Sequence, residues 1–129
     1  MILKDFDAWN EEKKQIDARE DALLYREREV RWCRLGANVG FEQDGTGRDH
    51  SRPVLILKGF SRSVCLVLPL TTSSKKHPYH TSVGVIGNRP AFVIISQLRL
   101  VDTKRLDQKI TTLNRNVFEG VRKAVKDML

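Results

Sequence analysis

The feature that most limits how this chain can fold is a series of short apolar runs, each closed by Gly, Pro or polar turn residues. The runs are Val30–Leu35, Pro53–Leu57, Val64–Leu68, Thr81–Ile86 and Ala91–Ile95. Runs of this length, bounded in this way, are typical of β-strands. Their close spacing predicts an antiparallel, strongly curved sheet or a small barrel.

Residues 4–28 are typical of a helix, because they contain no Gly or Pro and are rich in Glu, Lys, Ala and Leu. Their apolar stripe is narrow, so this helix would lie on the side of the domain or contact a partner or a second copy. We therefore divide the chain into an N-terminal helical extension, 1–28, and a barrel domain, 29–129. The expected fold is mainly β with flanking helices.

A second helix is predicted at residues 116–128. Asn116 precedes Glu119 by three positions, which is a capping pattern. Apolar side chains then recur at helical spacing, at Val117, Val121, Ala124, Val125 and Met128. The pattern predicts an amphipathic helix that packs on the sheet.

Length and composition indicate one globular domain. Of the 129 residues, 40% are apolar and 30% are charged, and no apolar run approaches the roughly 20 residues that span a bilayer. Asp5 and Asp7 lie where a signal peptide would be basic and then continuously apolar. We expect a cytoplasmic protein.

The net charge of +7 is unevenly distributed. Residues 1–29 hold six Lys or Arg against nine Asp or Glu, which leaves 17 basic and 7 acidic residues, a net +10, in 30–129. Such a basic domain suggests a polyanionic partner, either nucleic acid or an acidic protein segment.

Cys33 and Cys65 each lie inside an apolar run. Two cysteines in a cytosolic chain are typically reduced and buried as small hydrophobic residues. No Cys-x-x-Cys pair is present, so no structural zinc site is expected. A Cys/His nucleophile pair stays open with three histidines available, although no spacing favours it.

Residues 39–54 combine loop-forming and reactive residue types. Three glycines allow positive φ angles and make the segment a loop. Directly before an apolar run, the loop holds Glu42, Gln43, Arg48, His50 and Arg52. A charged loop on a buried strand is a common place for binding and catalysis. The plainer alternative is a solvated hairpin connection.

Several motifs occur in a fixed order along the chain. They are Gly40-Phe-Glu42-Gln43-Asp-Gly45 and Arg52-Pro53-Val54, then Pro69-Leu70-Thr71-Thr72, then Ile95-Ser96-Gln97-Leu98-Arg99, running on to the C-terminal helix. Together they resemble the MazF/PemK (Kid) family of toxin endoribonucleases from toxin–antitoxin modules. The resemblance covers roughly residues 29–128, which is more specific than any single motif.

The resemblance implies a compact SH3-like antiparallel β-barrel, usually a homodimer. It implies cleavage of single-stranded RNA at short sequences, without a metal or cofactor, by attack of the 2′-hydroxyl to leave a 2′,3′-cyclic phosphate and a 5′-hydroxyl. It also implies a cognate antitoxin whose acidic, disordered tail folds over the RNA-binding groove. A second hypothesis keeps this fold without catalysis, as a binding module like the gyrase-poisoning toxins or as an interacting homologue that has lost activity.

The resemblance assigns catalytic roles to Arg52 and Thr71. Attack by a 2′-hydroxyl needs a proton acceptor, a donor to the leaving 5′-oxygen and positive charge on the pentavalent phosphorane. The Arg52 guanidinium suits the charge role better than proton transfer, because it is permanently cationic and bidentate. The Thr71 hydroxyl would position the phosphate or the 2′-hydroxyl. Glu42 is the best carboxylate to act as base or to orient Arg52.

The chain departs from the Kid branch at two positions. Phe41 stands where that branch has a histidine, and Ser96 stands where it has an acidic residue. A mechanism that uses that histidine and acid is closed to this protein, so Arg52 and Thr71 must carry more of the reaction.

RNA binding would use a wider set of side chains. Basic loop residues would contact phosphate, amides and a guanidinium would read base edges, and an aromatic ring would stack on an unpaired base unless it packs under its own loop. The predicted set is Phe41, Gln43, Arg48, His50, Thr72, Lys75, Lys76, Gln97 and Arg99.

Overall fold

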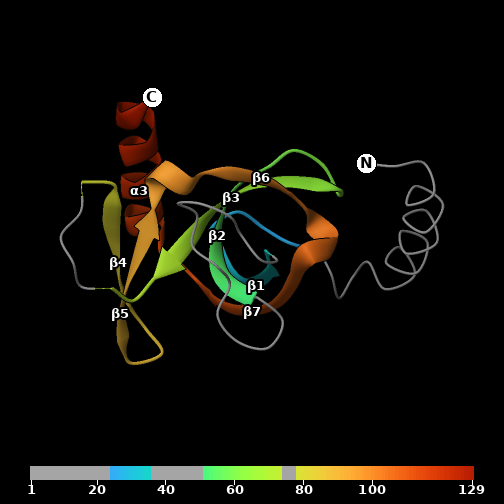
Figure 1. Cartoon of the computed structure of the whole chain (residues 1–129), viewed down its shortest axis with the longest axis horizontal. Helices are drawn as coiled ribbons and strands as arrows, with labels where there is room; N and C mark the ends of the chain where they lie inside the picture. Colours follow the sequence, from blue (N-terminus) through green and yellow to red (C-terminus); the bar gives the residue numbers. More distant parts are fainter. Residues whose placement is uncertain (1–23, 36–50, 74–77) are drawn as a thin grey trace.

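The computed structural model describes residues 24–35, 51–73 and 78–129, which form strands, two short 3₁₀ helices and one α-helix (Figure 1). The strands are β1 (Glu29–Arg34), β2 (Ser51–Gly59), β3 (Val64–Thr71), β4 (His80–Ile86), β5 (Arg89–Ile94), β6 (Arg99–Asp102) and β7 (Leu106–Thr112). The helices are η1 (Ile95–Gln97), η2 (Thr103–Arg105) and α3 (Arg115–Met128).

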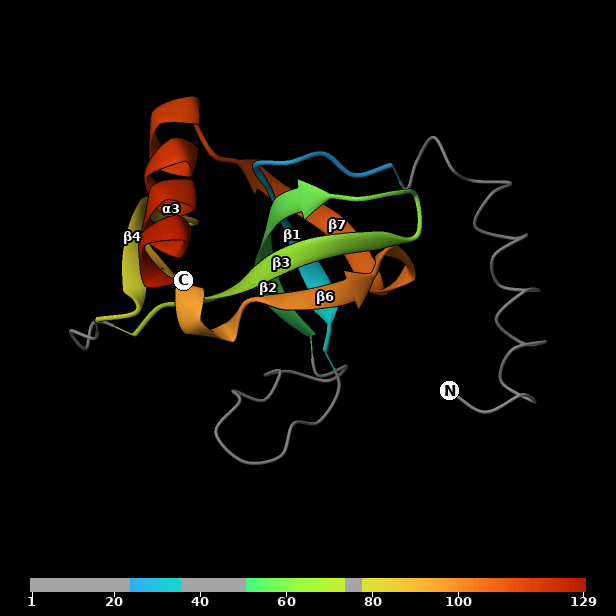
Figure 2. The same cartoon turned by 90° about the horizontal axis from the view of Figure 1, so that it is seen from above.

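The sheet is antiparallel and is organised around β3. Its strand order is β4-β5-β3-β2-β1-β7, and β6 also pairs with β3. On one edge β3 pairs with β2, and on the other its first half pairs with β6 while Leu70 and Thr71 pair with β5. The sheet therefore curls into a half-barrel (Figures 1 and 2). The β4–β5 hairpin lies at one side of this half-barrel, next to α3. The predicted fold class, a small curved antiparallel sheet with a C-terminal helix, is confirmed.

β2 explains why the apolar runs are continuous rather than alternating. Leu55 and Leu57 belong to a core shared with α3, whereas Val54 and Ile56 belong to a second core formed with β1, β3 and β6. All four side chains are buried. Because both faces of the strand are covered, both sets of alternating positions must be apolar.

All five predicted strands are present, but β6 and β7 were not predicted as strands. β7 has only one buried residue, Leu106, and most of the positions that follow are exposed. It lies at the end of the strand order and, among the strands that the structure describes, pairs with β1 alone, through an irregular register. A polar edge strand of this kind carries no apolar run that a sequence pattern could reveal.

The helix α3 is confirmed, but its cap is not the predicted one. The N-cap is Asn114, whose side-chain oxygen accepts a hydrogen bond of 2.9 Å from the Val117 backbone N–H. An N-cap residue needs extended backbone angles, and Asn114 has them (φ −69°, ψ 160°). Asn116 already lies inside the first turn, so the predicted capping pattern is wrong. The buried face of α3 consists of Phe118, Val121 and Val125.

The predicted N-terminal helix falls outside the described residues except at 24–28, which are not helical. This segment is instead bound to the sheet. The Tyr25 hydroxyl donates to the carbonyl oxygens of Ser61 and Val64, the latter over 3.2 Å. The backbone N–H of Arg28 donates to the carbonyl oxygen of Ile56 over 3.0 Å. These bonds hold the chain on the β2–β3 hairpin before β1 begins.

Both cysteines are buried and unbonded to each other, as predicted. Within the described parts of the chain, no helix is both long and apolar enough to cross a membrane.

Candidate active site

A pocket of about 650 Å³ opens where β3 leaves β2 and turns to β5. The last β2–β3 pair is Val54 with Pro69, and the next residues of β3 pair with β5 instead. The strands therefore separate just where Arg52 and Thr71 lie. The pocket is lined by Val30, Trp32, Arg52, Pro53, Leu70, Thr71, Thr72, Ile86, Arg89, Ala91 and Ile110.

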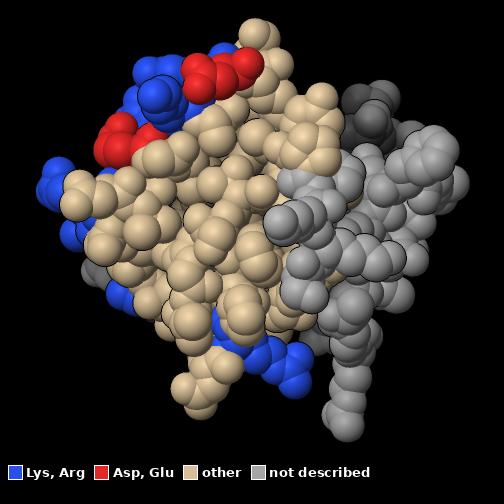
Figure 3. All heavy atoms as spheres, turned by 90° about the vertical axis from the view of Figure 1, so that its left-hand side faces the viewer, with Lys and Arg blue, Asp and Glu red and all other residues tan. Residues whose placement is uncertain are grey.

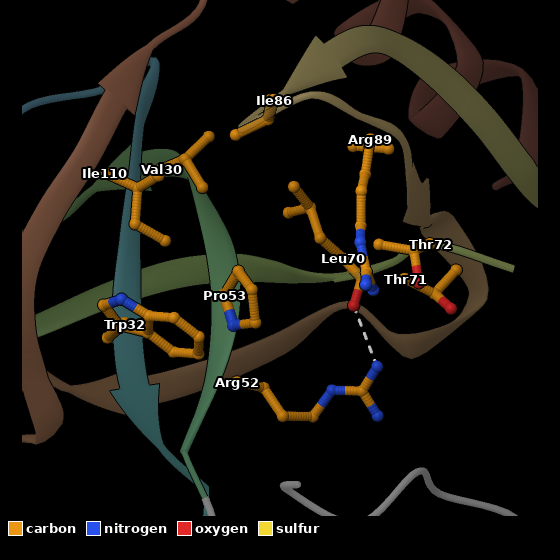
Figure 4. Close-up of a pocket in the computed structure, with 11 residues that line it drawn as sticks. Val30, Trp32, Arg52, Pro53, Leu70, Thr71, Thr72, Ile86, Arg89 and Ile110 are labelled. Carbon is orange, nitrogen blue, oxygen red and sulfur yellow. Dashed lines mark hydrogen bonds between the residues drawn. The ribbon is translucent and has the colours of Figure 1, made fainter. Parts of the chain in front are cut away.

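Arg52 bridges the two separating strands. Its side chain is buried, with 7% of the residue exposed, and its Nη2 donates a hydrogen bond of 2.8 Å to the carbonyl oxygen of Leu70 (Figure 4). A buried guanidinium needs such acceptors, because burial of an unpaired charge is costly. The bond fixes the guanidinium at the rim of the pocket, where its charge would act on a bound anion.

Thr71 is the last residue of β3 and is half-buried. Its hydroxyl oxygen accepts a hydrogen bond of 3.1 Å from the Ser73 backbone N–H, which closes a local turn. Because the hydroxyl is the acceptor in this bond, its own proton is left to donate to a ligand in the pocket. Thr72 is exposed and also lines the pocket. Arg52, Thr71 and Thr72 thus line the same pocket.

Arg89 and Trp32 are pocket residues with polar or aromatic side chains that were not predicted as site residues. Arg89 is the first residue of β5, directly after a two-residue turn at Gly87 and Asn88, which have φ angles of 58° and 66°. Two positive φ angles define the tight hairpin turn whose twist matches the flanking strands, and the turn pairs Arg89 with Ile86. The Gly87-Asn88 pair indicates a turn from the sequence alone, but no neighbouring residue indicates that this turn lies near the end of β3.

Trp32, the second unpredicted residue, lies on β1 and is 41% exposed. It is paired with Pro53 on β2, and both residues line the pocket, with Trp32 on the side away from Arg89 (Figure 4). The run Val30–Leu35 was predicted to be a strand, but its alternation of apolar and polar residues did not show which face of that strand lines a pocket.

Two other predicted residues that the structure describes, Gln97 and Arg99, are not part of this group. Gln97 lies in η1 and Arg99 begins β6, where it pairs with Val67, and neither lines the pocket. The remaining seven lie outside the described residues, so their roles stay predictions. They are Phe41, Glu42, Gln43, Arg48, His50, Lys75 and Lys76.

The charge around the pocket favours an anion. Its lining includes two guanidiniums, of Arg52 and Arg89, and no carboxylate among the residues that the structure describes. In the same described set, no group of three or more His, Cys, Asp or Glu side chains is placed to hold a metal ion. The site can therefore bind phosphate through guanidinium and hydroxyl groups of the chain itself.

The cysteines are poorly suited to a nucleophilic role. Burial raises the pKa of the Cys33 thiol to about 11 and that of the Cys65 thiol to about 12. Because the thiolate is the nucleophilic form, neither cysteine is activated for attack, and neither lines the pocket. The Cys/His alternative from the sequence is not supported.

Known structures of the same architecture come from toxins. MazF from Deinococcus radiodurans has a TM-score of 0.66 at 18% identity, over 81% of this chain and 96% of that one. An endoribonuclease in complex with its cognate antitoxin, from a mycobacterial species, has a TM-score of 0.62 at 15% identity, over 81% and 93%. The Mycobacterium tuberculosis toxin MazF-mt6 has a TM-score of 0.60 at 22% identity, over 78% and 94%. At these identities the likeness establishes the fold.

The sequence itself carries the family assignment. No curated protein matches the chain. A family model for the PemK-like, MazF-like toxins of type II toxin–antitoxin systems matches residues 26–129, which include every strand, the α-helix and the pocket. The chain belongs to this toxin family.

Proposed function

We propose that the protein is the toxin of a toxin–antitoxin module and acts as an endoribonuclease on single-stranded RNA. The observation that carries this proposal is the pocket where Arg52 and Thr71 meet. Family membership and the endoribonucleases among the structural relatives give it further support.

The proposed reaction is an internal transfer at one phosphodiester. The 2′-oxygen attacks phosphorus, the bond to the 5′-oxygen breaks, one proton leaves the 2′-hydroxyl and one reaches the departing 5′-oxygen. Arg52 would stabilise the charge on the phosphorane, and the Thr71 hydroxyl would position a phosphate oxygen or the 2′-hydroxyl. Glu42 remains our predicted base or orienting group for Arg52. No metal or cofactor is needed for these steps.

The experiment is cleavage of single-stranded RNA by the purified protein in EDTA, with a DNA of the same sequence as control. We expect RNA fragments whose 5′-hydroxyl ends accept phosphate from a polynucleotide kinase without prior dephosphorylation, and intact DNA. Arg52→Ala should abolish cleavage, whereas Arg122→Ala, on the exposed face of α3, should not. Intact RNA with wild-type protein, or equal cleavage by Arg52→Ala, would overturn the proposal.

A binding role without catalysis is the second candidate, and Ser96 in place of the Kid branch's acidic residue is what favours it. Ser96 is exposed in η1 and supplies no carboxylate. The two candidates separate in cells. If expression arrests growth and Thr71→Ala relieves the arrest without lowering the protein level, catalysis is supported. Arrest that persists with Thr71→Ala favours binding alone.

We also propose that the protein is a homodimer and binds an antitoxin with an acidic tail. The face formed by β4 and α3 has an uncharged centre, with Lys, Arg, Asp and Glu side chains at its margin (Figure 3). Val85 on β4 is 70% exposed, and Tyr79 just before β4 is 42% exposed. A contiguous uncharged surface of this kind suits a subunit contact.

Sedimentation tests the dimer. Val85→Asp should shift the protein toward monomer, whereas Leu100→Asp, at an exposed position on β6, should not. The antitoxin is tested by co-expressing the product of the adjacent gene, which should restore growth if it has an acidic tail. Binding between the two should weaken as salt rises.

A further inference from the structure

The candidate active site has an apolar part that takes no part in the proposed reaction. The polar end of the pocket carries Arg52, Thr71, Thr72 and Arg89, and the rest of its wall is apolar. The apolar part is lined by Val30, Trp32, Pro53, Leu70, Ile86, Ala91 and Ile110. A volume of about 650 Å³ is larger than one phosphate group requires and lies in the range of pockets that hold small organic ligands.

Arg89 gives the polar end a second cation. The hairpin turn at Gly87 and Asn88 aims it into the pocket from the side opposite to Arg52 (Figure 4). Its residue is exposed, and within the described residues its side chain makes no hydrogen bond or ion pair. Two guanidiniums that face one space repel each other unless an anion lies between them. Phosphate and carboxylate are the anions that match their planar donor geometry.

Trp32 gives the apolar part a flat surface. The residue is 41% exposed and is paired with Pro53 in the β1–β2 ladder. Exposed aromatic rings beside cationic side chains are the usual elements of single-strand recognition, because an unpaired base stacks on the ring while the cations bind its phosphate.

We propose that this pocket is a nucleotide subsite, in which Trp32 stacks on one unpaired base of the RNA and Arg89, with Arg52, binds the phosphate beside that base. This deepens the proposed function and rests on it for the identity of the substrate. An acidic peptide would also meet the two arginines. The flat Trp32–Pro53 wall beside them favours a base over an aliphatic side chain.

Nucleotide binding can be measured without any cleavage. The chain has two tryptophans, so Trp9→Phe leaves Trp32 as the single fluorescent indole. We would titrate this protein with each of the four nucleoside 3′-monophosphates, with ribose 5-phosphate and with inorganic phosphate. At least one nucleotide should quench Trp32 and bind roughly 5- to 150-fold more tightly than inorganic phosphate, which is the range expected for one stacked base.

Variants test the base-stacking part and the phosphate-binding part of the subsite separately. Binding to the variants that lack Trp32 is measured by calorimetry. Trp32→Ala should reduce nucleotide affinity to that of inorganic phosphate, and Trp32→Phe should keep most of the difference. Arg89→Gln should weaken nucleotide and inorganic phosphate alike, whereas Arg122→Gln should weaken neither. Trp32→Phe also serves as the folded comparison if Trp32→Ala proves unstable in urea.

Three results would overturn the subsite. One is equal affinity for nucleotides and inorganic phosphate, and another is unchanged nucleotide binding in both Trp32→Phe and Trp32→Ala. The third is a change of oligomeric state in Trp32→Ala with nucleotide binding intact, which would make Trp32 a contact for a second copy. RNA cleavage without Trp32-dependent binding overturns the subsite alone, whereas nucleotide binding without cleavage overturns only the endonuclease.

Discussion

The guanidinium of Arg52 bonds to the carbonyl oxygen of Leu70 over 2.8 Å, at the point where the ladder between β2 and β3 has already ended. One side chain therefore closes the gap between the two strands and carries positive charge at the rim of the pocket. Substitutions of Arg52 must be interpreted with both roles in view, because a loss of activity can follow from a loss of stability.

Arg52→Lys separates the two roles. The lysine keeps the charge but loses the planar fork that binds the Leu70 carbonyl and a phosphate together. We expect a loss of about 1–2 kcal/mol in the free energy of unfolding and a fall of at least about 100-fold in single-turnover RNA cleavage. Urea unfolding and cleavage of a labelled RNA measure the two effects. Cleavage at the wild-type rate by Arg52→Lys would show that charge alone is sufficient.

Thr71→Val and Thr71→Ser test the hydroxyl without changing the size of the side chain much. Valine removes the acceptor for the Ser73 N–H and the donor to a ligand, so cleavage should fall by about 100-fold or more. Serine keeps both and should stay within about tenfold of wild type. The same RNA assay, with circular dichroism to confirm folding, gives the comparison. Equal rates for the two variants would remove the hydroxyl from the mechanism.

The residues of the pocket differ in how far the sequence could predict them. Arg52 and Thr71 were predicted because they belong to motifs that resemble a known family and lie beside apolar runs. Arg89 and Trp32 were not, because their convergence depends on where β3 exchanges one neighbour for another. That exchange is a property of the sheet as a whole. No local spacing of residues encodes it.

The position of the α3 N-cap also depends on contacts that the local sequence does not show. Asn114 and Asn116 both stand near the start of an apolar helical pattern, so the pattern allows either as the cap. Asn114 is the cap because Leu113, just before it, is buried and held in place. The Leu113 backbone N–H donates a hydrogen bond to the carbonyl oxygen of Arg28, in the segment before β1. The chain is still extended at Asn114 and turns helical only after it.

Paired alanine variants test that cap. Asn114→Ala should lower the free energy of unfolding by about 1 kcal/mol, because the Val117 N–H loses its acceptor. Asn116→Ala, inside the first turn, should change it by less than about 0.5 kcal/mol. Urea unfolding followed by far-ultraviolet circular dichroism resolves the difference. The reverse order would restore Asn116 as the cap.

Gly59→Ala tests the packing of the segment before β1. A methyl group at Gly59 would come within 2.7 Å of the Tyr25 hydroxyl oxygen, which is already bonded to the β2–β3 hairpin. We expect a loss of about 1–3 kcal/mol in the free energy of unfolding. In a Tyr25→Ala background the same change should cost little, because the obstructing ring is gone. Additive costs of the two substitutions would contradict the contact.

The buried thiols predict a loss of stability in alkali. Folding raises the pKa of Cys33 to about 11 and of Cys65 to about 12, from an ordinary value of 9.0. Between pH 9 and its raised pKa, each thiol loses its proton in the unfolded chain but keeps it in the folded chain. Stability from these groups is therefore complete below pH 9 and falls as the pH rises toward 12, by up to about 1.4 kcal/mol per pH unit for each thiol.

Urea unfolding at about pH 7.5, 9 and 10.5 measures this slope. Other groups also titrate in this range, so the informative quantity is the difference between proteins. Cys65→Ala should start less stable, because a buried sulfur is lost, but its stability should fall less steeply above pH 9. Parallel slopes in wild type and Cys65→Ala would mean that the thiol does not titrate with unfolding. The alkaline loss would then belong to other side chains.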